Sequence, residues 1–151
     1  VGYSYRTELS SVVDRVMGEI APRRGVAAGS GTMAFRAARD GHFHVDAAVD
    51  GTPVRFMIDT GATDVVLSAA DARRLGFDLK SLRFSRTYRT ANGSVSGAPV
   101  TLREIRVGSI ALHDFHASVN GGELDHSLLG MSFLGRLAAF GVENGTLTLR
   151  Q

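Results

Sequence analysis

The stretch that decides the fold is residues 56–63, Phe-Met-Ile-Asp-Thr-Gly-Ala-Thr. Three apolar residues lead directly into Asp59, and Gly61 follows in a tight turn, where the missing side chain gives the backbone its freedom. Thr60 offers a hydroxyl that can pin such a loop. Taken alone, Asp-Thr-Gly is also an ordinary end of a strand. The apolar run before it predicts that the Asp59 carboxylate is held rigidly at the end of a buried strand.

Two further features favour a catalytic role for this segment over a plain turn. The apolar run resumes at once as Val-Val-Leu at residues 65–67. Far downstream, Ser127 is followed by two apolar residues and a glycine, which are Leu128, Leu129 and Gly130. An acidic loop between apolar segments, with a second apolar motif later in the chain, is more specific than either motif alone.

Alternation of apolar and polar residues predicts a domain of short strands. Asp50-Gly51, Asn92-Gly93 and Asn144-Gly145 are hairpin turn signals. We expect strands at residues 43–49, 54–58, 65–67, 87–90, 94–96, 100–107, 110–119 and around Leu147 and Leu149. Ser68 is expected to cap a short helix over 69–75 that stops at Gly76, and residues 128–137 should include another. The sequence thus predicts a mostly β, barrel-like domain over residues 32–151.

Residues 1–31 follow a different pattern. One face of an amphipathic helix is predicted from apolar residues at helical spacing, which are Leu9, Val12, Val13, Val16, Met17 and Ile20. Pro22 marks its end, and residues 23–31 are expected to be a Gly-rich linker.

Composition excludes several classes of protein. The chain has 151 residues, of which 44% are hydrophobic and 21% charged, so it is not disordered. It has no cysteine, which excludes thiol catalysis and disulfides. A net charge of +2 without a dense basic patch does not indicate nucleic-acid binding. No apolar run is long enough to span a bilayer, and no Gly-Xaa-Ser-Xaa-Gly motif indicates a serine hydrolase.

Residues 56–62, the hairpin over 87–95 and the Leu128–Gly130 motif, in this order, resemble the retropepsin-like aspartic proteases. The resemblance covers roughly residues 36–151 and looks closest to the bacterial members that carry an N-terminal membrane anchor. It implies a closed β-barrel, the acid-protease fold. It also implies an aspartic endopeptidase that works without metal or cofactor. Because one chain has one Asp-Thr-Gly, two chains must form a homodimer with one Asp59 each.

The resemblance also assigns roles to individual residues. The catalytic set is Asp59, Thr60 and Gly61, and the second motif is Leu128, Leu129 and Gly130. The residues expected to line the substrate groove are Ala62, Thr63, Asp64, Tyr88, Ala91, Asn92 and Gly93. Retroviral relatives usually have Asp where this chain has Thr63, and an Arg that braces the dimer where it has Met131. The family also implies a periplasmic location, tethered to the inner membrane by an upstream anchor.

Three other hypotheses remain open. The domain could be a catalytically silent peptide-binding or dimerisation module of the same fold. It could instead be a tethered interaction domain whose active part is the N-terminal helix. A metal site is the third, built from His42, His44, His113, His116 and Asp114, although half-exposed strand residues explain these better, because nothing ties the two pairs together.

Overall fold

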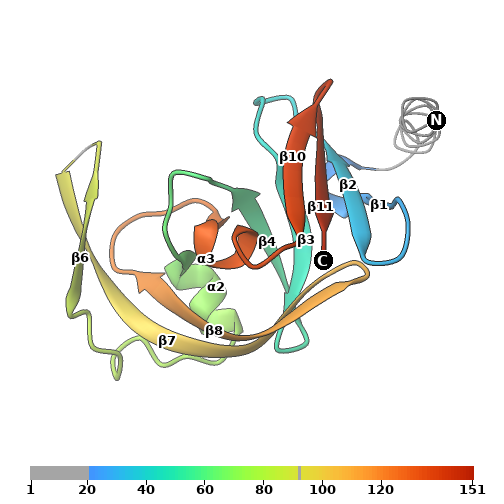
Figure 1. The fold of residues 1–151 in the computed structure, drawn as a ribbon. Coiled ribbons are helices and arrows are strands. Elements are labelled where there is room, and N and C mark those ends of the chain that lie inside the picture. The colour runs from blue at the N-terminus through green and yellow to red at the C-terminus, as the bar shows by residue number, and fades with distance from the viewer. Residues whose placement is uncertain (1–20, 92) are drawn as a thin grey trace, which may run out of the picture.

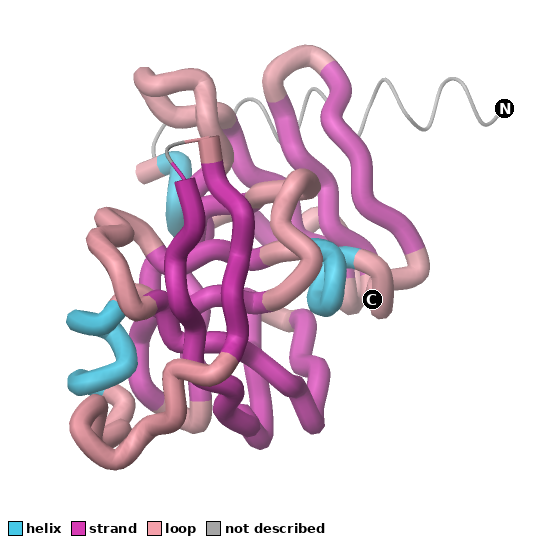
Figure 2. Tube along the Cα trace, turned by 90° about the vertical axis from the view of Figure 1, so that its left-hand side faces the viewer, coloured by secondary structure: helices cyan, strands magenta, loops and turns pink. Residues whose placement is uncertain are grey.

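The computed structural model describes residues 21–91 and 93–151. Strands dominate these residues and the helices are short (Figure 2). The predicted helix within residues 1–20 and the turn residue Asn92 lie outside the described residues. Within the described ranges, no helix combines the length and apolar character needed to cross a bilayer.

Seven strands form the main sheet (Figure 1). Their order is β3 (His44–Val49), β4 (Thr52–Ile58), β9 (Ser127–Leu129), β5 (Val65–Leu67), β8 (Ile110–Asn120), β7 (Gly93–Val107) and β6 (Arg86–Thr90). Neighbours are antiparallel except β4–β9 and β5–β8, which are parallel. Strand β3 also pairs with β7, at Ala48–Arg106 and Val49–Ile105. The sheet therefore curls back on itself. The predicted mostly β fold is confirmed, while a closed barrel stays a prediction.

The core residues of β3 and β4 follow the predicted alternation of apolar and polar residues. Val45, Ala47 and Val49 of β3 are buried, and so are Val54 and Phe56 of β4. These side chains alternate with more exposed ones because successive residues of a strand face opposite sides of the sheet. The expected fully apolar strand β5 lies in the middle of the sheet between β9 and β8.

Tight turns join two of the hairpins as predicted. Asp50 and Gly51 have φ of 48° and 84°, and Asn144 and Gly145 have φ of 52° and 71°. Two successive residues with positive φ make the turn that matches the twist of paired strands. Asn, Asp and Gly tolerate this region of the backbone best.

A second sheet has the order β1 (Val26–Ala27), β2 (Thr32–Arg36), β11 (Thr146–Arg150) and β10 (Ala139–Glu143). Leu147 and Leu149 are buried on one side of β11, as expected. The interpretation of residues 23–31 as a linker is wrong in part. A 3-10 helix, η1 (Pro22–Arg24), and strand β1 fall within or overlap that range. Pairing of β1 with β2 orders this segment, and it leaves no room for a side chain at Gly25, which lies against the Phe35 ring.

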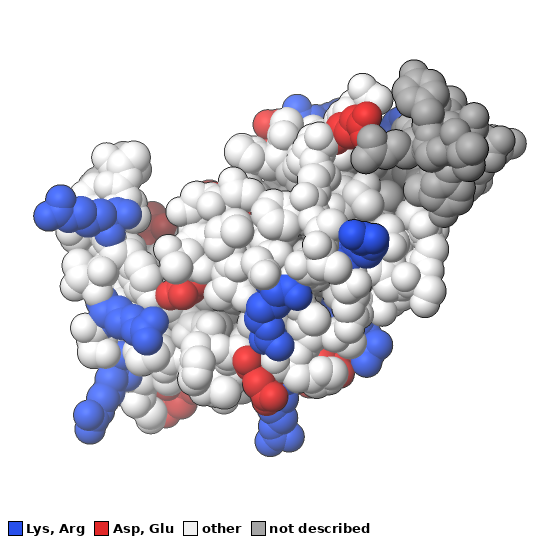
Figure 3. Space-filling view, in the orientation of Figure 1, with Lys and Arg blue, Asp and Glu red and all other residues white. Residues whose placement is uncertain are grey.

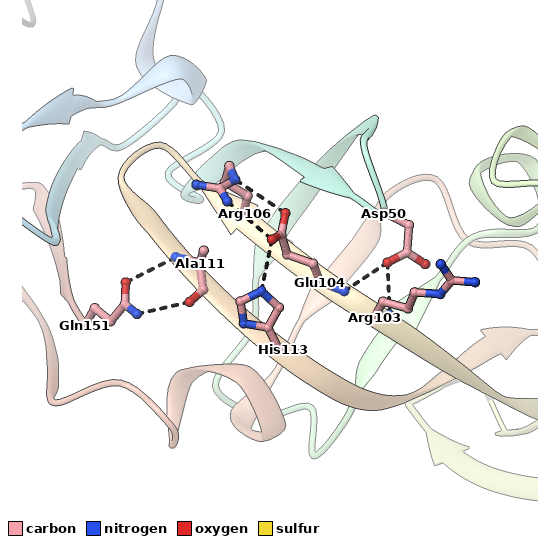
Figure 4. Close-up of polar contacts among 7 residues, drawn as sticks. All are labelled: Asp50, Arg103, Glu104, Arg106, Ala111, His113 and Gln151. Atoms are coloured by element: carbon pink, nitrogen blue, oxygen red, sulfur yellow. Dashed lines mark hydrogen bonds and ion pairs between the residues drawn. The ribbon is translucent and has the colours of Figure 1, made fainter.

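The C-terminal residue is fastened to the main sheet (Figure 4). The side-chain amide of Gln151 accepts a hydrogen bond from Ala111 N at 3.1 Å and donates one to Ala111 O at 3.0 Å. Beside it, Arg106 lowers the pKa of the Glu104 carboxyl, His113 acts in the same sense, and partial burial opposes them. The two Gln151 hydrogen bonds hold the end of β11 against the β7–β8 hairpin.

The two short α-helices of the described residues lie where the local sequence patterns predict them. Helix α2 (Ala69–Arg74) starts as predicted, because Ser68 Oγ accepts a hydrogen bond from Asp71 N at 3.1 Å. Helix α3 (Met131–Leu134) lies within the predicted range.

The predicted break between strands 94–96 and 100–107 is wrong, since β7 is one continuous strand. Pairing with β6 ends at Gly97, so Pro99 has a paired strand on one side only, where its missing N–H is tolerated.

Candidate active site

Asp59 follows β4 directly and is anchored to the neighbouring parallel strand. Its backbone N–H donates to Leu129 O of β9 at 3.1 Å. Its carboxylate oxygen Oδ1 accepts a hydrogen bond from Gly61 N at 2.9 Å, and Ala62 N donates to Asp59 O at 3.2 Å. The side chain is thus oriented by the turn that follows it, while Thr60 and Gly61 are exposed. The carboxylate is rigidly held and accessible.

Helix α3 braces the loop behind Asp59. Met131 N donates to Ala62 O at 2.9 Å, and Ser132 N donates to Thr63 O at 2.8 Å. The Ser132 hydroxyl accepts a hydrogen bond from Val65 N at 3.0 Å. Two adjacent N–H groups at the start of α3 therefore satisfy the carbonyls of the loop, which fixes its path.

Gly130 allows this close approach. A Cβ atom there would lie 2.6 Å from Ala62 O and closer still to Asp64 O. Gly130 has φ of −94° and ψ of −165°, so ordinary residues could adopt its backbone. Space, and not backbone conformation, requires glycine at this position. The second motif thus lies against the Asp-Thr-Gly loop, with Leu129 and Gly130 buried and Leu128 half-buried.

A buried polar link, absent from the predicted site, supports the second motif. Ser127 Oγ donates to Asp71 Oδ2 at 2.6 Å and accepts from Ser68 N at 2.9 Å. Arg74 Nη1 binds the other oxygen of Asp71 at 3.0 Å. The Ser-Xaa-Xaa-Asp spacing signals the cap, but nothing local signals the bond to Ser127.

The hairpin formed by β6 and the first part of β7 leans toward the Asp59 loop. Tyr88 OH donates to Asp64 Oδ2 at 3.1 Å, and Arg86 Nη1 lies 3.6 Å from the same oxygen. The structure therefore brings together two residues of the predicted groove, Tyr88 and Asp64. It adds Arg86, whose pKa the Tyr88 hydroxyl raises above its usual value. Ala91 is exposed in the hairpin turn, and Gly93 has φ of 118° at its end.

The histidines do not gather around a metal site. His44 is buried, binds Asp40 Oδ2 through Nε2 at 2.9 Å and packs its ring against His126. The His42 N–H, and then the His44 ring, hold the pKa of the Asp40 carboxyl below its usual value. His113 instead binds Glu104 on β7. Residues 21–91 and 93–151 contain no group of three or more His, Asp or Glu side chains arranged to hold a metal ion.

Comparison with known proteins gives consistent matches. The family model described as "gag-polyprotein putative aspartyl protease" matches residues 45–136. An uncharacterised protein of Rickettsia prowazekii is 38% identical over 148 residues, which are 98% of this chain and 64% of that protein. The chain thus spans less than two thirds of this relative.

Solved structures match as well. A retropepsin-like aspartic protease from Rickettsia conorii has a TM-score of 0.73 and 43% identity, covering 79% of this chain and 89% of that one. The equine infectious anaemia virus (EIAV) protease, solved with the inhibitor HBY-793, has a TM-score of 0.55 and 21% identity. This match covers 66% of this chain and 91% of the viral one, and it supports the fold alone.

Proposed function

Because the chain belongs to the retropepsin-like aspartic protease family, we propose that it is an aspartic endopeptidase that hydrolyses peptide bonds as a homodimer. One observation carries the proposal. Asp59 is an accessible carboxylate, oriented by Gly61 N and anchored to β9 through Leu129 O. The second motif braces the loop that carries this carboxylate, and Gly130 allows the two segments to approach closely.

The chemistry requires two copies of Asp59. Two carboxylates about 3 Å apart cannot both ionise, so the pair shares one proton. The ionised Asp59 takes a proton from water as the water oxygen bonds to the peptide carbonyl carbon. Asp59 of the partner subunit gives its proton to the carbonyl oxygen. Collapse of this tetrahedral intermediate breaks the C–N bond and delivers a proton to the leaving nitrogen. Thr60 would hydrogen-bond across the two-fold axis. Gly61 would lie beside the backbone of the bound peptide.

The surface of the domain supports assembly with a second copy. All five residues of β10 are exposed, and β10 is an edge strand of its sheet. Phe140 is 38% exposed and Val142 is 59% exposed on one side of this edge. Met131, beside the Asp59 loop, is 37% exposed. Among the described strands, β10 pairs only with β11, so its other edge is open. Proteins normally protect an open apolar edge, and a second β10 strand would cover this one.

We expect Val142→Asp to weaken the dimer at least about tenfold, because it places a charge on an apolar contact. Sedimentation velocity over a range of concentrations measures the dissociation constant. Thr101→Asp, on an exposed position of β7, is the matched control and should leave it unchanged. Equal dissociation constants for the two variants would mean that β10 is not the contact.

The hairpin of β6 and β7 would act as a flap over the substrate. The peptide would bind in an extended form, as an added strand, between the hairpin and the residues that follow Gly61. Ala62, Thr63 and Asp64 would form one wall, and Tyr88, Ala91, Asn92 and Gly93 the other. Closure would exclude water other than the attacking molecule. The periplasmic location and the upstream membrane anchor remain predictions, which fractionation of cells would test.

The function is tested by incubating the protein with a mixed peptide library from pH 3 to pH 8 and identifying the products by mass spectrometry. We expect endoproteolytic cuts with a bell-shaped dependence on pH, because the pair must hold one proton. The cut sites would also give the substrate preference. No cleavage at any pH, in a sample shown to be dimeric, would instead support the catalytically silent peptide-binding module.

A further inference from the structure

Strand β6 is the outermost strand of the main sheet and pairs only with β7 among the described strands. Four of its five residues are exposed, and Tyr88 is half-buried. Arg86 and Tyr88 both reach Asp64, so they share the inner face of the strand, as residues two apart should. Backbone pairing alone therefore gives β6 little support against the body of the domain.

Asp64 belongs to the rigid part of the site. It follows the Asp59 turn, its backbone carbonyl lies against Gly130, and it precedes the central strand β5. Its side chain is 24% exposed. A hydrogen bond from the hairpin to Asp64 is thus a bond to the loop that carries the catalytic carboxylate. No backbone pairing joins the two segments in this structure.

Gly97 makes this reach possible. It lies opposite Arg86 in the β6–β7 pairing, and a Cβ atom there would collide with the Tyr88 ring and with Ser118 Oγ. The ring therefore lies over bare backbone, with its hydroxyl directed at Asp64. Arg83, Arg86 and Arg89, on β6 and in the loop before it, are exposed. Figure 3 shows several Lys and Arg side chains on the side of the molecule where β6 lies.

We propose that Tyr88, aided by Arg86, is a positioning residue that latches the hairpin to Asp64 and holds it closed in the absence of peptide. The inference rests on the proposed function for its consequence: a peptide must open the latch to enter the groove, and the latch sets the position of the flap relative to Asp59. The catalytic loop and the flap of one subunit then move as a coupled pair. A substrate side chain that enters beside Asp64 meets a carboxylate, a phenol and a guanidinium.

Hydrogen exchange of the hairpin amides tests the latch without any need for cleavage. Tyr88→Phe keeps the ring over Gly97 and removes only the hydroxyl. We expect the amides of residues 86–97 to exchange about 3- to 10-fold faster, the size expected for one partly exposed hydrogen bond to a carboxylate. The matched control is Thr87→Val, which removes a hydroxyl from the opposite face of the same strand. It should leave exchange unchanged.

Two outcomes would overturn the latch. The hairpin amides of Tyr88→Phe could exchange at the same rate as those of Thr87→Val. Alternatively, Tyr88→Phe could accelerate exchange in β4 and β8 as much as in the hairpin, which would indicate general loss of stability. A double-mutant cycle adds a stricter test. Once Asp64→Ala has removed the acceptor, Tyr88→Phe should cause no further acceleration, whereas additive effects would contradict the latch. Since both experiments measure exchange and not cleavage, they stand or fall independently of the protease proposal.

Discussion

Asp59→Asn should lower kcat/KM for peptide cleavage by about 10⁴-fold or more. General acid–base catalysis by one group contributes about 10²- to 10⁴-fold, and the substitution would alter both halves of the proposed dyad, because each subunit would supply one Asp59. Asn has nearly the same shape as Asp, and its carbonyl oxygen can still accept the hydrogen bond from Gly61 N that holds the side chain. The variant should therefore keep the fold and the peptide affinity and lose the reaction. Cleavage of the best library peptide measures the loss of the reaction, and binding of the same peptide measures the affinity.

Asp78→Asn is the matched control. Asp78 is an exposed loop residue that bonds to Lys80 N and Ser81 Oγ, so activity should match the parent. An Asp59→Asn protein that cleaves as fast as the parent would rule out the dyad. Mixed dimers extend the test, because one intact Asp59 cannot both accept and donate the two protons. A dimer of one parent and one substituted subunit should be as inactive as the fully substituted dimer.

Gly130→Ala should be strongly damaging although it adds only one methyl group. The new methyl group would overlap Asp64 O and lie 2.6 Å from Ala62 O, and both are backbone atoms of the Asp59 loop. Overpacking of this kind costs about 1–3 kcal/mol. For a domain of this size, that cost corresponds to a decrease in melting temperature of about 2–12 °C. Activity should fall more steeply than stability, because the loop that must move carries the catalytic carboxylate.

Calorimetry and peptide cleavage measure these two effects side by side. Ala70→Ser is the control for melting temperature, since it adds one atom at an exposed position of α2, away from the Asp59 loop and from β10. The close approach of the second motif would lack functional meaning if Gly130→Ala had the stability and activity of the parent.

Much of the fold follows from patterns within a few residues. Alternation in β3 and β4, the positive-φ turns at Asp50-Gly51 and Asn144-Gly145, and the Ser68 cap of α2 were predictable, since each depends on neighbours in the chain. The same local logic failed at β7, where Gly97 and Pro99 suggest a break. It also failed at Gly25, whose neighbourhood suggests a linker. In both cases pairing with another strand, to β8 in one and β2 in the other, decides the conformation.

The candidate site divides in the same way. The sequence alone predicts a carboxylate at the end of an apolar strand. It also predicts a second apolar motif that ends in a glycine. The sequence alone does not predict the contacts that bring these parts together. Tyr88 meets Asp64 across 24 residues, and Ser127 meets Asp71 across 56. Gly130 lies against a loop that no local pattern connects to it.

The sequence by itself determined the strand periods, the turns and the residue that can do the chemistry, because these depend on steric and solvation preferences of adjacent residues. Only the tertiary structure decided which groups hold that residue in place. The hydrogen bonds and close approaches that do so form between segments that meet only after the sheet has curled and the core has packed.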